Sequence, residues 1–321
     1  MNDDYTALTS GAGSFHRPEA ELLAVTGEDR ERFLNGQVTC EVKGLAPGHG
    51  VYGFFTTPQG KVTADLRVLA AEDAFLLELP AGKRAEVVAR LDRYRIADRV
   101  DWSPLDDVTV LTVAGPRCAE VVPEAPAAAW AHREVEVGGA RVRLVRDDLL
   151  GVEALDLWVP AAAATEVAAA LRRAGAVEVT PATIDAVRVE RGAPRFGVDF
   201  ADHFPQETGL EAKGVSYSKG CYLGQEVVAR IHYRGGVNRG LRGVVYDGGE
   251  GAPGPAPGTV LLHGGRPAGS AGTVAFSPAL GRTAGLAVLH QRAAEPGTVL
   301  EVEGGGSAEV RALPLVGAAD G

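Results

Sequence analysis

The sequence lacks the cysteine patterns and the long apolar runs that mark several protein classes. Of 321 residues only three are cysteine, Cys40, Cys118 and Cys221, and none forms a CxxC pair. This excludes a disulfide framework and a cysteine-based zinc site, and it suits a reducing compartment. No run approaches the roughly 20 apolar residues that a membrane helix needs. The N-terminal residues lack the apolar core of an export signal, so we expect a cytoplasmic protein without a membrane partner.

The usual catalytic and nucleotide-binding motifs are also missing. The chain has no GxxxxGK[ST], no GxGxxG between a strand and a helix, no GxSxG and no HExxH. Its seven histidines are scattered and form no metal-ligand pair at helical spacing. We therefore predict no metal site, and we expect none of the common hydrolase or dehydrogenase mechanisms.

Negative charge dominates, but not everywhere. The formal net charge is −10, which argues against general nucleic-acid binding. Residues 213–242, however, contain one acid, Glu226, and six cations: Lys213, Lys219, Arg230, Arg234, Arg239 and Arg242. This segment is either a solvated face or a local anion site.

Length and patterning predict three units. We place an α+β domain at 1–106, a second α+β domain at 107–238 and a β-barrel domain at 239–321. The first contains alternating strands within 51–80 and an amphipathic helix at 81–96. The second ends in two helices, at 180–192 and 224–236, the earlier one capped by Thr180. The short, evenly spaced strands after residue 240 are typical of a small antiparallel barrel.

The glycine-rich segment 188–243 carries the most specific pattern. It reads R-x-E-x-G-x-P-x-x-G-x-D, then P-x-E-x-G-L, then K-G-C-Y-x-G-Q-E-x-x-A-R. This series resembles the YgfZ family of folate-binding proteins, relatives of the glycine-cleavage T-protein (aminomethyltransferase) that assist iron–sulfur proteins. The segment FLNGQVTCEVKGL and the hairpin TTPQGKVTADLRV resemble the start of the same superfamily. The likeness extends from about residue 20 to about residue 315.

The resemblance implies a three-domain ring, with two α/β units that contain ferredoxin-like elements and a C-terminal β-barrel around bound tetrahydrofolate. It implies that Glu190 contacts the pterin, although Glu190 could instead pair with Arg188 or Arg191. Arg230 and Arg239 are candidates for the carboxylate of the folate tail, or else surface cations. Tyr222 is a further candidate for folate contact.

The chain departs from the T-protein at a hairpin where that family carries Gly-Gly-x-x-Asp-Asp-Leu. Here the first acid is Ala64 and only Asp65 remains. A single carboxylate can still orient an amine, but the loss makes glycine-cleavage chemistry doubtful. Cys221 replaces an aspartate that is common in the T-protein, and this substitution points to the YgfZ branch.

Three roles are open for Cys221. As a reagent it needs a stabilised thiolate, which Lys219 could provide. As a cluster ligand it needs further ligands from a partner. As a packing residue it needs only space. We expect a tetrahydrofolate-binding accessory protein for iron–sulfur cluster assembly or repair, with iron–sulfur client or assembly proteins as partners. The alternatives are a folate-dependent one-carbon transferase or demethylase that uses Asp65 on a small amine, and a non-catalytic folate-binding regulator.

Overall fold

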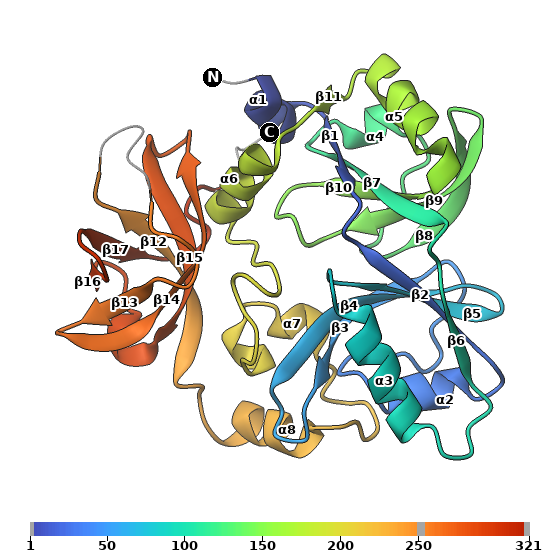
Figure 1. Ribbon diagram of the computed structural model, residues 1–321, viewed down its shortest axis with the longest axis horizontal. Helices are drawn as coiled ribbons and strands as arrows, with labels where there is room; N and C mark the ends of the chain where they lie inside the picture. The colour runs from blue at the N-terminus through green and yellow to red at the C-terminus, as the bar shows by residue number, and fades with distance from the viewer. Residues whose placement is uncertain (1–2, 249–253, 318–321) are drawn as a thin grey trace.

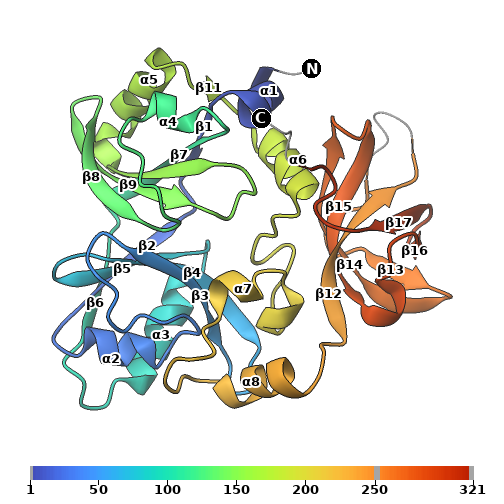
Figure 2. The same cartoon turned by 180° about the vertical axis from the view of Figure 1, so that it is seen from behind.

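The computed structural model describes residues 3–248 and 254–317 (Figure 1). Two open sheets and one closed barrel surround a connecting segment that contains α6 (Pro181–Arg191) and α7 (Glu211–Gly214), as the opposite views of Figures 1 and 2 show. Among the described residues, no helix is long and apolar enough to cross a membrane.

The first sheet is antiparallel and has the order β3-β4-β5-β2-β6. Its strands are β2 (Glu21–Thr26), β3 (Gly50–Thr56), β4 (Val62–Ala70), β5 (Ala74–Leu79) and β6 (Asp101–Pro104). Helices α2 (Arg30–Asn35) and α3 (Arg84–Tyr94) bury apolar side chains against one face. Because side chains alternate along a strand, Ala64 and Leu66 point into this core whereas Asp65 points to the opposite face.

The second sheet has the order β11-β1-β7-β10-β9-β8. Its strands are β1 (Gly13–Arg17), β7 (Val108–Ala114), β8 (His132–Val137), β9 (Ala140–Asp147), β10 (Ala154–Pro160) and β11 (Val177–Glu178). Helices α4 (Cys118–Val121), η1 (Ala161–Ala163) and α5 (Ala164–Arg173) accompany it. Strand β1 pairs with β7 and β11, so residues 13–17 lie in the second sheet although they precede the predicted boundary at 106/107.

The connecting segment begins with α6, whose start is as the sequence predicts. The side chain of Thr180 accepts from the Thr183 N–H, and Pro181 is the first helical residue. After α6 come η2 (Pro205–Glu207), α7 and α8 (Gln225–Arg234). Helix α1 (Asp3–Ser10) packs beside α6, and sequence patterning did not predict α1 or β1.

The barrel is closed in the order β12-β15-β14-β13-β16-β17, which confirms the predicted C-terminal barrel. Its strands are β12 (Arg239–Tyr246), β13 (Val260–His263), β14 (Arg266–Ser277), β15 (Arg282–His290), β16 (Val299–Val302) and β17 (Ser307–Arg311), with η3 (Gln291–Ala293) after β15. Residues 1–2 of the predicted first domain, and residues 249–253 and 318–321 of the predicted third domain, lie outside the described residues.

A central apolar cluster joins all these parts. It contains Tyr52 and Phe54 of the first sheet, Val189 of α6, Phe200 of the following loop and Leu286 of the barrel. Phe54 and Phe200 meet edge to face with ring centroids 6.3 Å apart. The inner face of the first sheet, which carries Asp65, therefore lies at the junction of the three units.

Candidate functional site

The residues 218–224, called the cysteine loop below, are held against the first unit by a buried lysine. Lys219 is only 6% exposed, and its ammonium donates to the carbonyls of Asn35 (2.8 Å), Val38 (2.7 Å) and Cys40 (2.5 Å). Burial lowers the pKa of Lys219 to about 8. Since all three ammonium donors bind carbonyls, Lys219 has an anchoring role in the structure. Its predicted effect on the Cys221 thiol stays a prediction.

The end of the cysteine loop requires a glycine. Gly224 has φ +89°, and an added Cβ would lie 2.4 Å from the carbonyl oxygen of Thr57. Next to it, the Thr56 hydroxyl donates to the carbonyl of Leu223 at 2.5 Å. Only glycine combines this backbone conformation with so close an approach, so the loop enters α8 along one defined path.

Cys221 lies at the open part of this loop. It is exposed, whereas Cys40 and Cys118 are buried. Burial raises the pKa of Cys40 to about 12 and also raises that of Cys118, so both remain thiols. An added Cβ at the neighbouring Gly220 would have no atom within 4 Å, so the backbone before Cys221 is also open to solvent. Cys221 is therefore not a core packing residue, and its thiol is accessible to a partner.

Asp65 occupies the inner face of the first sheet. The Tyr52 hydroxyl donates to its carboxylate at 2.8 Å, and the side chain is half-buried. Burial raises the pKa of Asp65 to about 6, while the hydrogen bond from Tyr52 and the charge of Arg67 limit the rise. A partly exposed carboxylate that costs free energy to bury can accept hydrogen bonds from a ligand.

Beside Asp65 a buried ionic network joins the two sheets. Arg67 pairs with Glu78, Asp147 and Asp156, and Arg17 pairs with Glu78 and Asp156. Burial raises the pKa of Asp147 to about 6, although Arg67 opposes the rise. The network fixes Arg67, which lies beside Asp65 on the same face of β4, and it links the two sheets through buried ion pairs.

The central apolar cluster includes Tyr52, the hydrogen-bond partner of Asp65. Tyr52 stacks on Trp130 with ring centroids 5.8 Å apart, and Phe54 meets Tyr52 edge to face at 5.3 Å. Hydrophobic residues that are only partly buried adjoin the central cluster: Leu149, Val215, Ala275, Leu280, Leu313 and Leu315. An aromatic ring system such as a pterin needs apolar walls and a few polar anchors, and Asp65 is such an anchor. The carboxylate and the neighbouring apolar residues are the kinds of group that a pterin needs, and tetrahydrofolate binding here stays a prediction.

Glu190 is placed where α6 meets α1 and the barrel. Its carboxylate accepts from the Tyr5 hydroxyl (2.7 Å), the Ser277 hydroxyl (2.5 Å) and the Ala279 N–H (3.2 Å). Arg188 instead pairs with Asp185 and Asp199. Glu190 thus anchors α6, and its contact with the pterin stays a prediction.

The remaining predicted residues lie in different places. Tyr222 is buried with its ring 5.3 Å from the Lys219 ammonium, and its hydroxyl has no hydrogen-bond partner within the described part of the chain. Burial raises the pKa of this hydroxyl. Arg230 is exposed on α8, whereas Arg239 begins β12 and lines a cleft.

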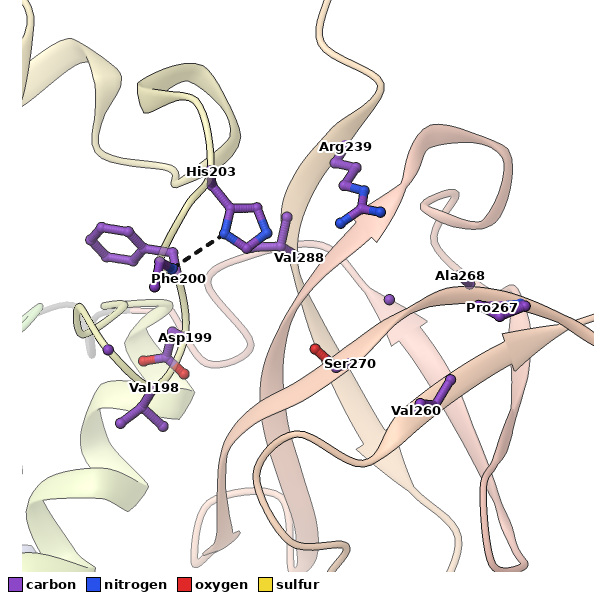
Figure 3. A pocket seen from close by; sticks show the side chains of 13 residues that line it. Val198, Asp199, Phe200, His203, Arg239, Val260, Pro267, Ala268, Ser270 and Val288 are labelled. Atoms are coloured by element: carbon purple, nitrogen blue, oxygen red, sulfur yellow. Dashed lines mark hydrogen bonds between the residues drawn. The ribbon is translucent and has the colours of Figure 1, made fainter. Parts of the chain in front are cut away.

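The cleft lies between residues 197–203 and the barrel and has a volume of about 370 Å³ (Figure 3). His203 projects from the loop, whereas Arg239, Val260, Ser270 and Val288 belong to barrel strands. The His203 Nδ1 atom accepts from the Ala201 N–H at 3.2 Å, and burial lowers the pKa of this histidine. The cleft therefore offers a guanidinium and a neutral imidazole to an anionic group.

Asp199 also lines the cleft, but its charge is already neutralised. Its carboxylate binds the Arg188 guanidinium and the N–H groups of Arg195 and Thr273. An anion near Arg239 therefore meets a paired aspartate, which does not repel it as a free one would.

Sequence reasoning did not find Tyr52, Arg67 or His203. Tyr52 and Arg67 share the inner face with Asp65, since Tyr52 pairs with Arg67 across β3 and β4. Strand alternation alone could have indicated this face. His203 carried no usable signal, because its place in the cleft depends on the fold. Within the described residues, no group of three or more His, Cys, Asp or Glu side chains could hold a metal ion.

Two open sheets and a closed barrel around this centre define the class of the glycine-cleavage T-protein. The fold is similar to that of aminomethyltransferase T from Bartonella henselae, with a TM-score of 0.85 over 98% of this chain and 89% of that one, at 21% identity. The sequence matches the GCVT N-terminal domain over residues 1–214 and the glycine cleavage T-protein C-terminal barrel domain over residues 239–316. The predicted three-part T-protein-like architecture is confirmed.

Curated relatives define the branch. The chain is 31% identical to the "tRNA-modifying protein YgfZ" of an Enterobacter species, over 68% of each chain. It is 28% identical to the protein of that name from Cronobacter sakazakii, over 74% of this chain and 71% of the relative. The chain belongs to the GCVT family and, within it, to the YgfZ family.

Proposed function

We propose that this chain is a tetrahydrofolate-binding accessory protein that supports iron–sulfur cluster assembly or repair, and through it tRNA modification. The observation that carries the proposal is the separation of two features in one YgfZ-family fold. A half-buried carboxylate lies beside the central apolar cluster, and an exposed cysteine lies on a loop fixed by Lys219. The relatives' name supplies the link to tRNA modification.

In this proposal the folate is held by residues of several units. The carboxylate of Asp65 accepts from the amino and ring N–H groups of the pterin, and the partly buried hydrophobic residues pack against its rings. Arg239 binds the tail carboxylate by charge-assisted hydrogen bonds, with His203 beside it. Arg230, Tyr222 and Glu190 remain candidates for further contacts. Bound folate would supply a site for a one-carbon unit.

Cys221 serves cluster chemistry in the same proposal. Its exposure allows a partner to reach the sulfur, and a cluster bound there would need further ligands from that partner. A cytoplasmic location belongs to the proposal, since three free cysteines suit a reducing compartment.

One observation favours the alternative, a folate-dependent one-carbon transferase or demethylase. The missing acid at position 64 would have pointed into the core of the first unit, where Ala64 is 1% exposed. The inner face therefore keeps its carboxylate, Asp65, despite the departure from the T-protein pattern. The loss of the acid at position 64 is therefore weaker evidence against amine chemistry than comparison with the T-protein pattern suggested.

Both functions require folate binding. Titration of the purified protein with tetrahydrofolate under anaerobic conditions tests this binding. We expect saturable binding of one folate per chain, weakened by Asp65→Asn and unchanged by Cys221→Ser. Absence of saturable binding would contradict both functions. Transfer of a one-carbon unit from a small amine by the purified protein, abolished by Asp65→Asn, would favour the alternative.

A further inference from the structure

The cations of residues 213–242 divide into two groups. Lys213 pairs with Asp148 at 2.6 Å, Lys219 binds three carbonyls, and Arg242 donates to the carbonyls of Leu241 and Ala294. These three stabilise the fold. Arg230, Arg234 and Arg239 are exposed, and among the described residues they form no ion pair. Much of the free positive charge of the segment is therefore presented outward.

Helix α8 concentrates this charge on one face. Val228 is buried, so the helix packs through that side. Arg230, Tyr233 and Arg234 are spaced three and four residues apart, and this spacing places them together on the exposed side. Tyr233 is 69% exposed, which is unusual for a tyrosine. We call these three residues the α8 face.

A fixed aromatic cluster supports the α8 face. The rings of Tyr217 and His232 stack at 3.7 Å, and Tyr233 meets His232 edge to face at 4.9 Å. The Glu211 carboxylate accepts from the Tyr217 hydroxyl at 2.5 Å and lies 2.9 Å from the His232 Nδ1 atom. The rings are therefore ordered before any partner binds, and exposed, ordered Tyr and Arg side chains are typical of protein-binding hot spots.

The distribution of charge favours an acidic protein segment over a nucleic acid as the ligand of the α8 face. Glu226 lies one turn before Arg230, so the positive surface is confined to the C-terminal half of the helix. The chain as a whole carries −10, which opposes the long phosphate backbone of a nucleic acid. A short acidic protein segment needs only two or three cations and an aromatic contact, and the α8 face provides these.

We propose that the α8 face docks an acidic segment of a protein partner, on the helix that directly follows the cysteine loop. The loop leads into the N-terminal end of α8 through Gly224, so the exposed Cys221 and the α8 face lie toward opposite ends of one short helix, and a single partner protein can span both. The identification of the partner as an iron–sulfur protein rests on the proposed function. The docking itself follows from the arrangement of Arg230, Tyr233 and Arg234.

The test uses a photoreactive residue, p-benzoylphenylalanine, at position 233 of the full chain in living cells. After irradiation, the peptide attached to the chain is sequenced. We expect a protein adduct whose attached peptide contains more Asp and Glu than Lys and Arg. Arg234→Glu should reduce this adduct at least tenfold. Attached RNA, a neutral or basic peptide, or no adduct at all would overturn the proposal.

Arg173→Glu provides the matched control. Arg173 is the last residue of α5, as Arg234 is the last residue of α8, and its only ion pair among the described residues is long, at 3.9 Å to Glu166. The adduct should persist in this variant, and equal loss in both variants would contradict docking. Cys221→Ser should retain the adduct even where it loses support of iron–sulfur enzymes, so failure of the docking proposal is distinguishable from failure of the proposed function.

Discussion

The hydroxyl of Tyr52 donates a hydrogen bond of 2.8 Å to the carboxylate of Asp65, and both side chains lie on the inner face of the first sheet. Tyr52 is itself held between Trp130 and Phe54. The bond therefore orients one half-buried acid at the junction of the three units. Asp65 is the residue on which the predicted folate site depends most.

Asp65→Asn should weaken tetrahydrofolate binding about tenfold or more, since hydrogen bonds to a charged acceptor contribute about 1.5–3 kcal/mol. In the wild type, affinity should fall as the pH decreases through about 6, the pKa of Asp65, because protonation removes the charged acceptor. Calorimetric titration between pH 5 and pH 8 measures both effects. A wild-type profile as flat as that of the variant would remove Asp65 from the site.

The same substitution should stabilise the unliganded protein at neutral pH. The folded-state pKa of Asp65 is raised from 3.8 to about 6, so the folded state retains a proton that the unfolded state has already lost. Stability is thereby lost as the pH rises through this window, by at most about 3 kcal/mol. Asn cannot ionise and avoids this cost. Denaturant unfolding at pH 7.5 should show a higher midpoint for Asp65→Asn, and a lower midpoint would contradict the assigned environment.

Arg239→Ala should weaken the binding of tetrahydrofolate about tenfold, through loss of the contact with the tail carboxylate. A tetrahydropterin that lacks the tail should bind wild type and variant equally. Arg230→Ala is the comparison, because Arg230 is also exposed but does not line the cleft. An equal loss in both arginine variants would place Arg230 at the tail as well, and no loss in either would place the tail elsewhere.

Glu190→Ala should lower the free energy of unfolding by about 2–4 kcal/mol, because it leaves the buried Tyr5 and Ser277 hydroxyls without their acceptor. Tyr5→Phe removes one of these bonds and should cost about 1 kcal/mol. Urea denaturation measures both. If Glu190→Ala keeps wild-type stability and loses folate binding, the carboxylate acts on the pterin and not as an anchor.

Lys219→Met should destabilise the protein by about 2–4 kcal/mol, since three carbonyls lose a charged donor. The cysteine loop should also become more mobile, and hydrogen exchange at residues 220–224 should accelerate more than in α3. An unchanged exchange rate would show that the loop does not depend on this anchor.

The sequence predicted the elements whose signal is local. The alternation in 51–80 and the capped start of α6 agree with β3, β4, β5 and α6. Patterning missed α1 and β1, because a short helix and a five-residue strand at the chain start depend on contacts with α6 and β7. No single sequence reveals that the N-terminal strand joins the second sheet.

The residues of the candidate site also fall into two groups, those with a local sequence signal and those that only the fold brings together. Cys221 and Lys219 were found because the K-G-C-Y motif is contiguous, and Asp65 because its hairpin has a recognisable pattern. Tyr52, Trp130 and His203 come from separate segments that only the fold brings together. Similarly, the sequence placed Lys219 near Cys221 but could not show that its ammonium binds the carbonyls around Cys40.

The most direct test of the central claim is the activity of an iron–sulfur enzyme in a deletion strain that carries either the wild-type chain or Cys221→Ser. The account predicts that Cys221→Ser fails to restore the activity although the purified variant binds tetrahydrofolate with wild-type affinity, because the exposed sulfur and the folate site are separate. Full restoration of the activity by Cys221→Ser would contradict the account.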